Sequence, residues 1–205
     1  MHRFTHALAA LVLAAPAALA FAGDTNAFSN PAAGFALTKP AGWHYLSAAQ
    51  NMDNIKRMKL CDEEFHAMMK QYASAPLVAM SKYQEPFEDV NPSFKVNLKT
   101  YGQLKGIPAT ELIKLILPQF QKTFKDFALV QAPVDVKVAG IPSAYTRINY
   151  TMELPDGRSF PTSSELWIVP WGDYFFMIGA GTRQDEKTGT RTEIQGILDT
   201  VKITR

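Results

Sequence analysis

The hydrophobic and polar pattern near the N-terminus favours short β-strands. Two short runs, 34–38 and 43–46, flank the sequence Lys39-Pro40-Ala41-Gly42. A Pro-x-Gly sequence is typical of a compact turn between two strands. The pattern therefore predicts a hairpin at the start of the domain.

The period changes to that of a helix from Ser47 onward. A second helical segment is predicted from Asp62, which can cap a helix N-terminus, to the residue before Pro76. Two strands, 77–83 and 94–98, follow it, separated by an acidic segment that contains prolines. The second helical segment has apolar residues at i, i+3, i+4 and i+7, which are expected to face inward: Phe65, Met68, Met69 and Tyr72.

The clearest helical pattern begins at Gly106-Ile107-Pro108. Proline suits the first turn of a helix, and Glu111 lies near the positive end of the helix dipole. A kink or a restart is expected at Pro118, because proline removes one backbone hydrogen bond and crowds the preceding turn. The apolar stripe spans about four to five turns and is predicted to face the core: Ile113, Ile116, Leu117, Phe120, Phe124 and Phe127.

The C-terminal half is predicted to be a meander of antiparallel strands. Two short turn sequences, 155–158 and 170–173, join three of its four β-rich stretches. Alternation of Trp167 and Val169 with Leu166 and Ile168 predicts that both faces of the sheet are covered. The four stretches are 134–138, 144–154, 159–169 and 174–180.

A short helix and a closing strand are predicted to end the chain. Thr190-Arg191-Thr192-Glu193 has the form of a capping box, in which Thr190 and Glu193 each satisfy a free backbone amide. Residues 200–203 alternate as a strand, and the buried side of the helix is predicted to consist of Ile194, Ile197 and Leu198.

The first 22 residues have the pattern of a signal peptide. Arg3 precedes an uncharged run of sixteen residues, Ala7–Ala22, which closes with the small-x-small sequence Ala20-Phe21-Ala22. A membrane-spanning helix needs roughly 20 residues, so cleavage after Ala22 is expected, with an uncleaved anchor as the alternative. The expectation is a periplasmic or secreted protein with a tether over 23–30, one domain over 31–205, and no integral membrane span after cleavage.

Charge and cysteine content narrow the possible partners. The leader contains one arginine and no acid, so 20 basic and 19 acidic residues remain after it. No basic block is interleaved with aromatic residues, which argues against a nucleic-acid partner. Cys61 is the only cysteine, so an intramolecular disulfide and lipid attachment at the cleavage site are both excluded.

Several short motifs resemble the PsbP-like proteins, a family that includes bacterial DcrB-type exported proteins. The resemblance implies an α+β fold, an α-β-α sandwich with a central antiparallel sheet flanked by helices. It also implies binding, assembly or accessory functions, because members are generally not enzymes. The motifs are Phe28-x-Asn30, Gly34-Phe35-x-Leu37-x-x-Pro40-x-Gly42-Trp43, Gly140-Ile141-Pro142-Ser143, Trp167-Ile168-Val169, Gly172-Asp173-Tyr174-Phe175-Phe176 and the segment 197–203.

One cluster of residues is a weak candidate for a metal site. Cys61, Glu63 and His66 lie close along the chain, near methionine thioethers that would suit copper. The spacing matches no recognised ligand pattern, and ordinary helix packing explains the same residues. No metal and no cofactor are therefore expected.

The sequence contains no recognised catalytic motif. It lacks a nucleophile elbow, a His-Glu-x-x-His pair, a phosphate-binding loop and a dinucleotide-binding glycine pattern. Only His44 and His66 remain after the leader to serve as a base for a nucleophile. A non-enzymatic protein is the expectation, with an exported hydrolase as an alternative.

Aromatic residues supply the candidate contact surface. Trp171 lies in a predicted turn, where a large ring is hard to bury, so it is the first candidate for a partner or ligand contact, with Trp43 and Tyr174 beside it. The sequence thus predicts an accessory protein that binds an envelope protein or a small ligand. A carrier with a dry, aromatic-lined pocket between helix 108–125 and the sheet is the competing binding hypothesis. The oligomeric state is not implied.

Overall fold

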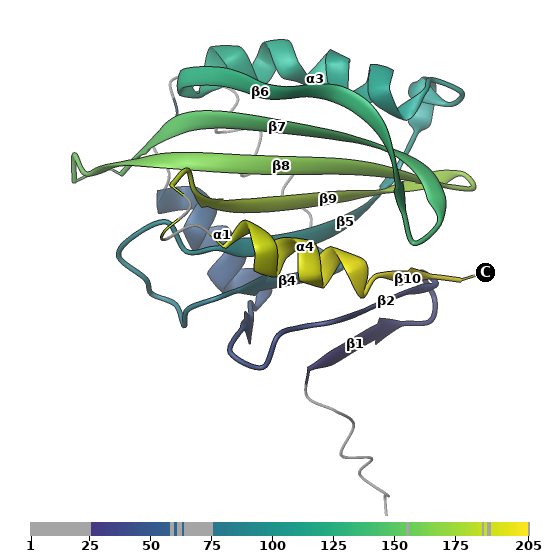
Figure 1. Ribbon diagram of the computed structural model, residues 1–205, viewed down its shortest axis with the longest axis horizontal. Coiled ribbons are helices and arrows are strands. Elements are labelled where there is room, and N and C mark those ends of the chain that lie inside the picture. Colours follow the sequence, from purple (N-terminus) through teal and green to yellow (C-terminus); the bar gives the residue numbers. More distant parts are fainter. Residues whose placement is uncertain are drawn as a thin grey trace, which may run out of the picture.

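A large antiparallel sheet organises the chain in the computed structural model (Figure 1). The strands of this sheet are β3 (His44–Tyr45), β4 (Val78–Ser81), β5 (Ser93–Thr100), β6 (Lys125–Val138), β7 (Ile141–Glu153), β8 (Ser159–Trp171) and β9 (Tyr174–Arg183). They are hydrogen-bonded in the order β3-β4-β5-β9-β8-β7-β6. The structure describes residues 26–57, 60, 63, 76–154, 156–185, 187 and 190–204.

The C-terminal strands form the predicted meander. β6 to β9 are neighbours in space in the same order as along the chain, and each pair is antiparallel. β6 begins at Lys125, earlier than the predicted 134–138, because its 14 residues follow β7 through several register shifts. Pairing with a long neighbouring strand thus extends a β-segment that its own sequence marks only weakly.

A second, three-stranded sheet lies below the first in Figure 1. It consists of β1 (Ala27–Asn30), β2 (Phe35–Thr38) and β10 (Lys202–Ile203), in the order β1-β2-β10. The expected tether over 23–30 is therefore wrong for its last four residues, which pair with β2. This pairing lets Phe28 pack against the core, so a segment that is polar and small on average is still ordered.

The hairpin predicted for 34–38 and 43–46 does not form. A turn is present, because Trp43 N–H donates to Pro40 O at 3.0 Å, but it leads from one sheet to the other. β2 already has β1 and β10 on its two edges, and β3 pairs with β4. The predicted turn is therefore confirmed, whereas the partner of each strand depends on the rest of the fold.

The long apolar helix is α3 (Ala109–Thr123), which continues through Pro118 without a restart. It ends before the predicted stripe does: Phe124 has extended backbone, and Phe127 lies in β6. The assignment of Phe127 to the helix is wrong because Lys125 is already paired with Thr151 of β7. A short 3-10 helix, η1 (Gly102–Leu104), precedes α3.

Two further helices occupy predicted positions, α1 (Ala48–Arg57) and α4 (Arg191–Asp199). The apolar side of α4 is buried as predicted, but its capping box is not formed. The Thr190 side chain makes no cap hydrogen bond, and its Oγ1 lies 3.2 Å from Thr182 Oγ1. The Glu193 carboxylate accepts hydrogen bonds from other parts of the chain, so it does not reach back to the start of the helix.

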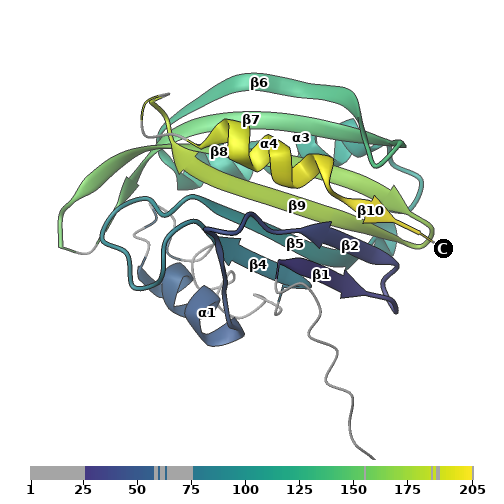
Figure 2. The ribbon, with the colours of Figure 1, turned by 60° about the horizontal axis from the view of Figure 1, so that its bottom comes forward.

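Each face of the large sheet has its own core. Trp167 and Val169 belong to the larger core, which α4 and the small sheet cover, whereas Ile168 belongs to a smaller core under α3. α3 and α4 lie on opposite sides of the sheet in Figure 2. The prediction that both faces are covered is confirmed, as is the α+β fold class with a central antiparallel sheet flanked by helices.

Two sequence predictions fall outside this description. The signal peptide over 1–22 and the helical segment that begins at Asp62 lie outside the described residues, except that Glu63 is helical and exposed. Within the described part of the chain, no helix combines the length and apolar character that crossing a bilayer requires.

Candidate functional site

The three aromatic candidates do not form one surface. Trp43 is only 2% exposed and packs in the larger core, with its indole N–H bonded to Glu193 at 2.8 Å. Trp43 is therefore wrong as a contact residue, because the connection between the two sheets runs through the core. Trp171 lies opposite Tyr174 across β8 and β9, but it is half-buried and packs against the larger core. Tyr174 is the exposed member, at 45%.

The proposed metal cluster is described only in part. Cys61 and His66 lie outside the described residues, and Glu63 is exposed. Among the residues that the structure describes, no group of three or more His, Cys, Asp or Glu side chains is placed to hold a metal ion.

A cavity of about 380 Å³ opens on the α3 face of the large sheet. Its walls come from α1, from the connection between β4 and β5, and from the C-terminal part of α3. This volume falls in the range of small-ligand sites in proteins. The apolar wall residues include Leu46, Ile55, Phe87, Val90, Phe120 and Phe124.

The floor of the cavity exists because the middle of the sheet has small residues there. Ser93 of β5, Gly181 of β9 and Ser164 of β8 lie side by side across the sheet. In the next row, Lys95 lies opposite Gly179, where a Cβ atom would meet nothing within 4 Å. Missing side chains at the two glycines therefore leave a depression between α1 and α3.

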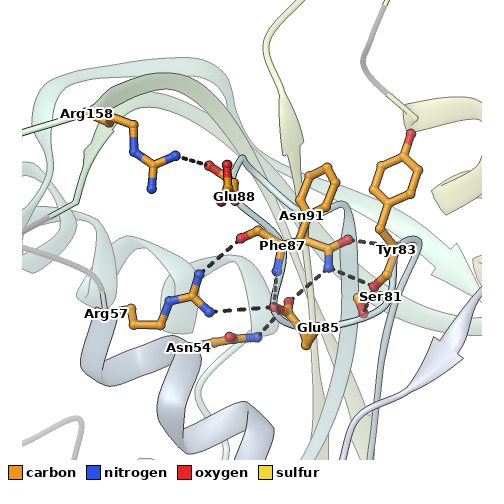
Figure 3. Close-up of polar contacts among 9 residues, drawn as sticks. All are labelled: Asn54, Arg57, Ser81, Tyr83, Glu85, Phe87, Glu88, Asn91 and Arg158. Carbon is orange, nitrogen blue, oxygen red and sulfur yellow. Dashed lines mark hydrogen bonds and ion pairs between the residues drawn. The ribbon is translucent and has the colours of Figure 1, made fainter. Parts of the chain in front are cut away.

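The connection between β4 and β5 is fixed to α1 by the Glu85 carboxylate (Figure 3). Asn54 Nδ2 and Asn91 Nδ2 donate to Glu85 Oε1 at 3.1 and 2.9 Å, and Phe87 N donates to Oε2 at 3.0 Å. Arg57 Nη1 lies 3.7 Å from the same carboxylate, whose side chain is 8% exposed. This network sets the position of one wall, because it joins the helix and the loop through a single buried anion.

The same connection is held to the meander at its other end. Arg158 Nη1 donates to Glu88 O at 2.9 Å, and Arg57 Nη2 donates to Phe87 O at 3.0 Å (Figure 3). Arg183 of β9 forms an ion pair with Asp89 at 2.6 Å. The loop that forms the wall is thus attached to α1, to the turn before β8 and to β9.

Aromatic rings form the opposite wall. Phe124 stacks on Tyr150 of β7 with ring centroids 4.2 Å apart, and Phe120 lies 5.5 Å from Phe124. Burial raises the pKa of the Tyr150 phenol, so this group stays neutral at physiological pH. The wall under α3 is therefore aromatic and uncharged.

Lys95 of β5 contributes its amine-bearing side chain to the cavity lining. It is half-buried, and no hydrogen bond or ion pair joins its Nζ to a residue in the described ranges. Burial lowers the pKa of Lys95, while the charge of Glu85 acts in the opposite direction. Withdrawing an amine from water without a partner costs free energy, so Lys95 is a candidate ligand-binding residue.

Sequence reasoning placed a possible pocket between the helix 108–125 and the sheet, whereas the cavity touches that helix only at Phe120 and Phe124. It did not single out Lys95, Gly179 or Glu85, because the lining comes from segments far apart along the chain. One signal was present in the sequence: Phe94-Lys95-Val96 places a lysine between two apolar residues of a buried strand. Gly179-Ala180-Gly181 similarly leaves a β-strand without bulky side chains on one face.

Comparison with known proteins identifies structural neighbours but no sequence family. No protein-family profile and no curated protein sequence matches the chain. LpqN, involved in cell envelope biogenesis of Mycobacterium tuberculosis, is 14% identical with a TM-score of 0.53, covering 90% of this chain and 88% of LpqN. The likeness to LpqN shows a shared fold.

Two further solved structures are similar at a lower level. Cyanobacterial PsbP from Synechocystis is 13% identical with a TM-score of 0.47, covering 87% of this chain and 91% of that protein. A Bacteroides thetaiotaomicron protein is also 13% identical with a TM-score of 0.47 over 88% of this chain. The chain spans about half the length of that protein, with 48% covered.

Proposed function

We propose that this protein is an exported, non-enzymatic binding protein that holds a small ligand in the cavity between α1, α3 and the large sheet. The observation that carries the proposal is the floor at Gly179 and Gly181, where the sheet lacks side chains beneath an aromatic wall. A core built only for stability fills such a space, because each unfilled volume costs packing energy. Assignment to the DcrB-type group of PsbP-like proteins rests on the sequence motifs alone.

The test uses the neutral fluorescent probe N-phenyl-1-naphthylamine, which brightens in apolar sites. We expect saturable binding to the wild-type protein with one site per chain. Gly179→Leu fills the floor from a position with open space above it, so it should weaken probe binding about tenfold or more. A protein that binds no probe, or a Gly179→Leu variant that binds it as the wild type does, would overturn the proposal.

Gly196→Leu is the matched control. Gly196 is an exposed glycine of α4, on the opposite side of the sheet, and a Cβ atom there also meets nothing within 4 Å. Its probe affinity should equal that of the wild type. Circular dichroism and thermal unfolding of both variants establish that the fold is retained.

Export is tested separately from binding. Fractionation of cells that express the full chain should recover the protein outside the cytosol, with a mature N-terminus at Gly23. A cytosolic protein that keeps residues 1–22 would contradict this part of the proposal. The hydrolase alternative would gain support from turnover of ester, peptide or glycoside substrates that is lost on replacing His44 or His66.

Binding of an envelope protein is the second candidate, favoured by the exposed ring of Tyr174. Large aromatic side chains supply contact area at protein interfaces. Cross-linking and affinity purification from the native envelope should then recover a partner that Tyr174→Ala captures less well. An unchanged partner profile would exclude this surface.

A further inference from the structure

Lys95 belongs to the cavity floor. Its cross-strand neighbours are Ala79 on β4 and Gly179 on β9, so neither side of the lysine has a bulky residue beside it. The same row continues to Leu166 and Thr146, on strands that α3 covers. The lysine thus lies beside Gly179, in a row of floor residues that continues toward α3.

In the described part of the chain, the other charged residues that line the cavity all have a charged or polar partner. Glu85 bonds to Asn54, Asn91 and Phe87 N and pairs with Arg57, and Asp89 pairs with Arg183. The third acidic lining residue, Glu165, directs its carboxylate to Arg191 of α4 on the other side of the sheet. Arg57 has partners in Glu85 and Phe87 O. Lys95 is the charged lining residue for which no hydrogen bond or ion pair joins it to another described residue. An anion from outside would complete the set.

We propose that the ligand is an amphipathic carboxylate whose acidic group binds Lys95 Nζ and whose apolar body lies over Gly179 toward Phe124 and Tyr150. This inference rests on the proposed function and adds the chemical class of the ligand. A charge-assisted hydrogen bond between a carboxylate and an ammonium is stronger than one between neutral groups, so the head group should contribute strongly to affinity. The apolar body gains by leaving water for the aromatic wall.

The test measures displacement of N-phenyl-1-naphthylamine by octanoate and by 1-octanol. Both competitors have the same eight-carbon chain and differ in the head group. Octanoate should displace the probe from the wild-type protein at a concentration at least about tenfold lower than 1-octanol, the ratio expected for a charged hydrogen bond. This comparison requires no variant, so it stands even where a substitution impairs folding.

Substitution of the lysine assigns the effect to one side chain. Lys95→Met keeps much of the side-chain length and removes the charge. It should therefore weaken displacement of the probe by octanoate at least about tenfold and change displacement by 1-octanol by no more than about twofold. Lys95→Arg should retain a preference for octanoate. Lys99→Met is the matched control, because Lys99 lies on the same strand and face but outside the cavity lining, and it should change neither competitor.

The outcomes separate this inference from the proposed function. Equal displacement by octanoate and 1-octanol, or an equal change of both in Lys95→Met, would overturn the carboxylate assignment while probe binding still supports a ligand cavity. Loss of the octanoate preference in Lys99→Met as well would point to general surface charge and also overturn it. Absence of saturable probe binding would overturn the proposed function itself.

Discussion

Trp43 Nε1 donates a hydrogen bond to Glu193 Oε2 at 2.8 Å, joining residues 150 positions apart. Lys82 Nζ binds the other oxygen of the same carboxylate at 2.6 Å. The first turn of α4 is thereby fixed to the connection before β3 and to the end of β4. This relationship explains why Glu193 does not complete a capping box and why Trp43 is not available to a partner.

Trp43→Phe should destabilise the protein by about 1–2 kcal/mol, because the ring still fills the core but the carboxylate loses a donor. Urea unfolding measures the change. Tyr45→Phe serves as the control, since it removes a hydrogen bond from an exposed hydroxyl to Asn26 O and should cost less than about 0.5 kcal/mol. Equal costs for the two variants would contradict a buried anchoring role for Trp43.

The Glu193 carboxyl should make stability depend on acidic pH. Burial favours its neutral form, but hydrogen bonds from Lys82 and Trp43 and the charge of Lys82 outweigh burial and hold the pKa of Glu193 below its usual range. The ionised form therefore stabilises the fold above the unfolded pKa, and this contribution is lost as pH falls through the folded pKa. Between about pH 6 and pH 3 the wild type should lose more stability than Glu193→Gln; parallel profiles would contradict this.

Gly34→Ala should be among the most damaging single substitutions in the small sheet. Gly34 has φ +65°, and a Cβ atom there would lie 2.0 Å from Thr204 O, beside β10. We expect a cost of about 3 kcal/mol or more, because the strained backbone and the displaced strand add together. Thermal and urea unfolding report it.

Gly172→Ala isolates the steric part of that effect. Gly172 has a similar φ of +60°, but nothing lies within 4 Å of the Cβ position. Its substitution should cost only about 1 kcal/mol, the penalty of a left-handed backbone. Similar costs at both glycines would show that β10 can shift away from a Cβ atom at position 34 without a cost in stability.

Tyr145 should give the fold an alkaline limit. Burial is the largest cause of the raised pKa of Tyr145. The hydrogen bond to Glu165 and the charge of that carboxylate act in the same direction and bring the pKa to about 12. Because the unfolded phenol ionises near pH 10, the stability from the neutral phenol is complete below that pH and declines as pH rises toward the folded pKa. Tyr145→Phe should flatten the fall in stability measured by urea unfolding between about pH 9 and pH 11. An unchanged slope would contradict it.

Substitution of Trp171 should destabilise the protein more than substitution of Tyr174, although the two residues lie opposite each other. Trp171 packs against the larger core, so Trp171→Ala should cost about 2 kcal/mol. Tyr174 is mainly exposed, so Tyr174→Ala should cost less than about 1 kcal/mol and leave probe binding in the cavity unchanged. A larger loss at Tyr174 would contradict the assignment of its ring to the surface.

Local pattern in the sequence predicted most of the elements and both faces of the meander. Trp167 and Ile168 alternate between two cores, because successive side chains of a strand point to opposite faces. The buried side of α4 follows in the same way from the helical spacing of Ile194, Ile197 and Leu198. Predictions of this kind succeed because the period is a property of the backbone itself.

The same local pattern does not predict which strands pair with each other or which side chains bond to each other. The turn at 39–42 was identified, but burial of Phe35 and Leu37 against α4 and the large sheet gives β2 its neighbours, and β3 pairs elsewhere. Glu193 had the right position for a capping box, yet a donor from Trp43 and a charge from Lys82 hold it instead. Local signals state what a residue can do, whereas competition among distant groups decides what it does.

The sequence by itself determined which segments are strands and helices and which of their faces are apolar, because those properties repeat within a few residues. Only the tertiary structure decided that Lys95, Gly179 and Phe124 share one cavity. The cavity arises where side chains are absent from neighbouring strands, and strand neighbours are selected by burial over the whole sheet. The chemistry of the cavity therefore depends on the fold, which brings together residues that are far apart in the sequence.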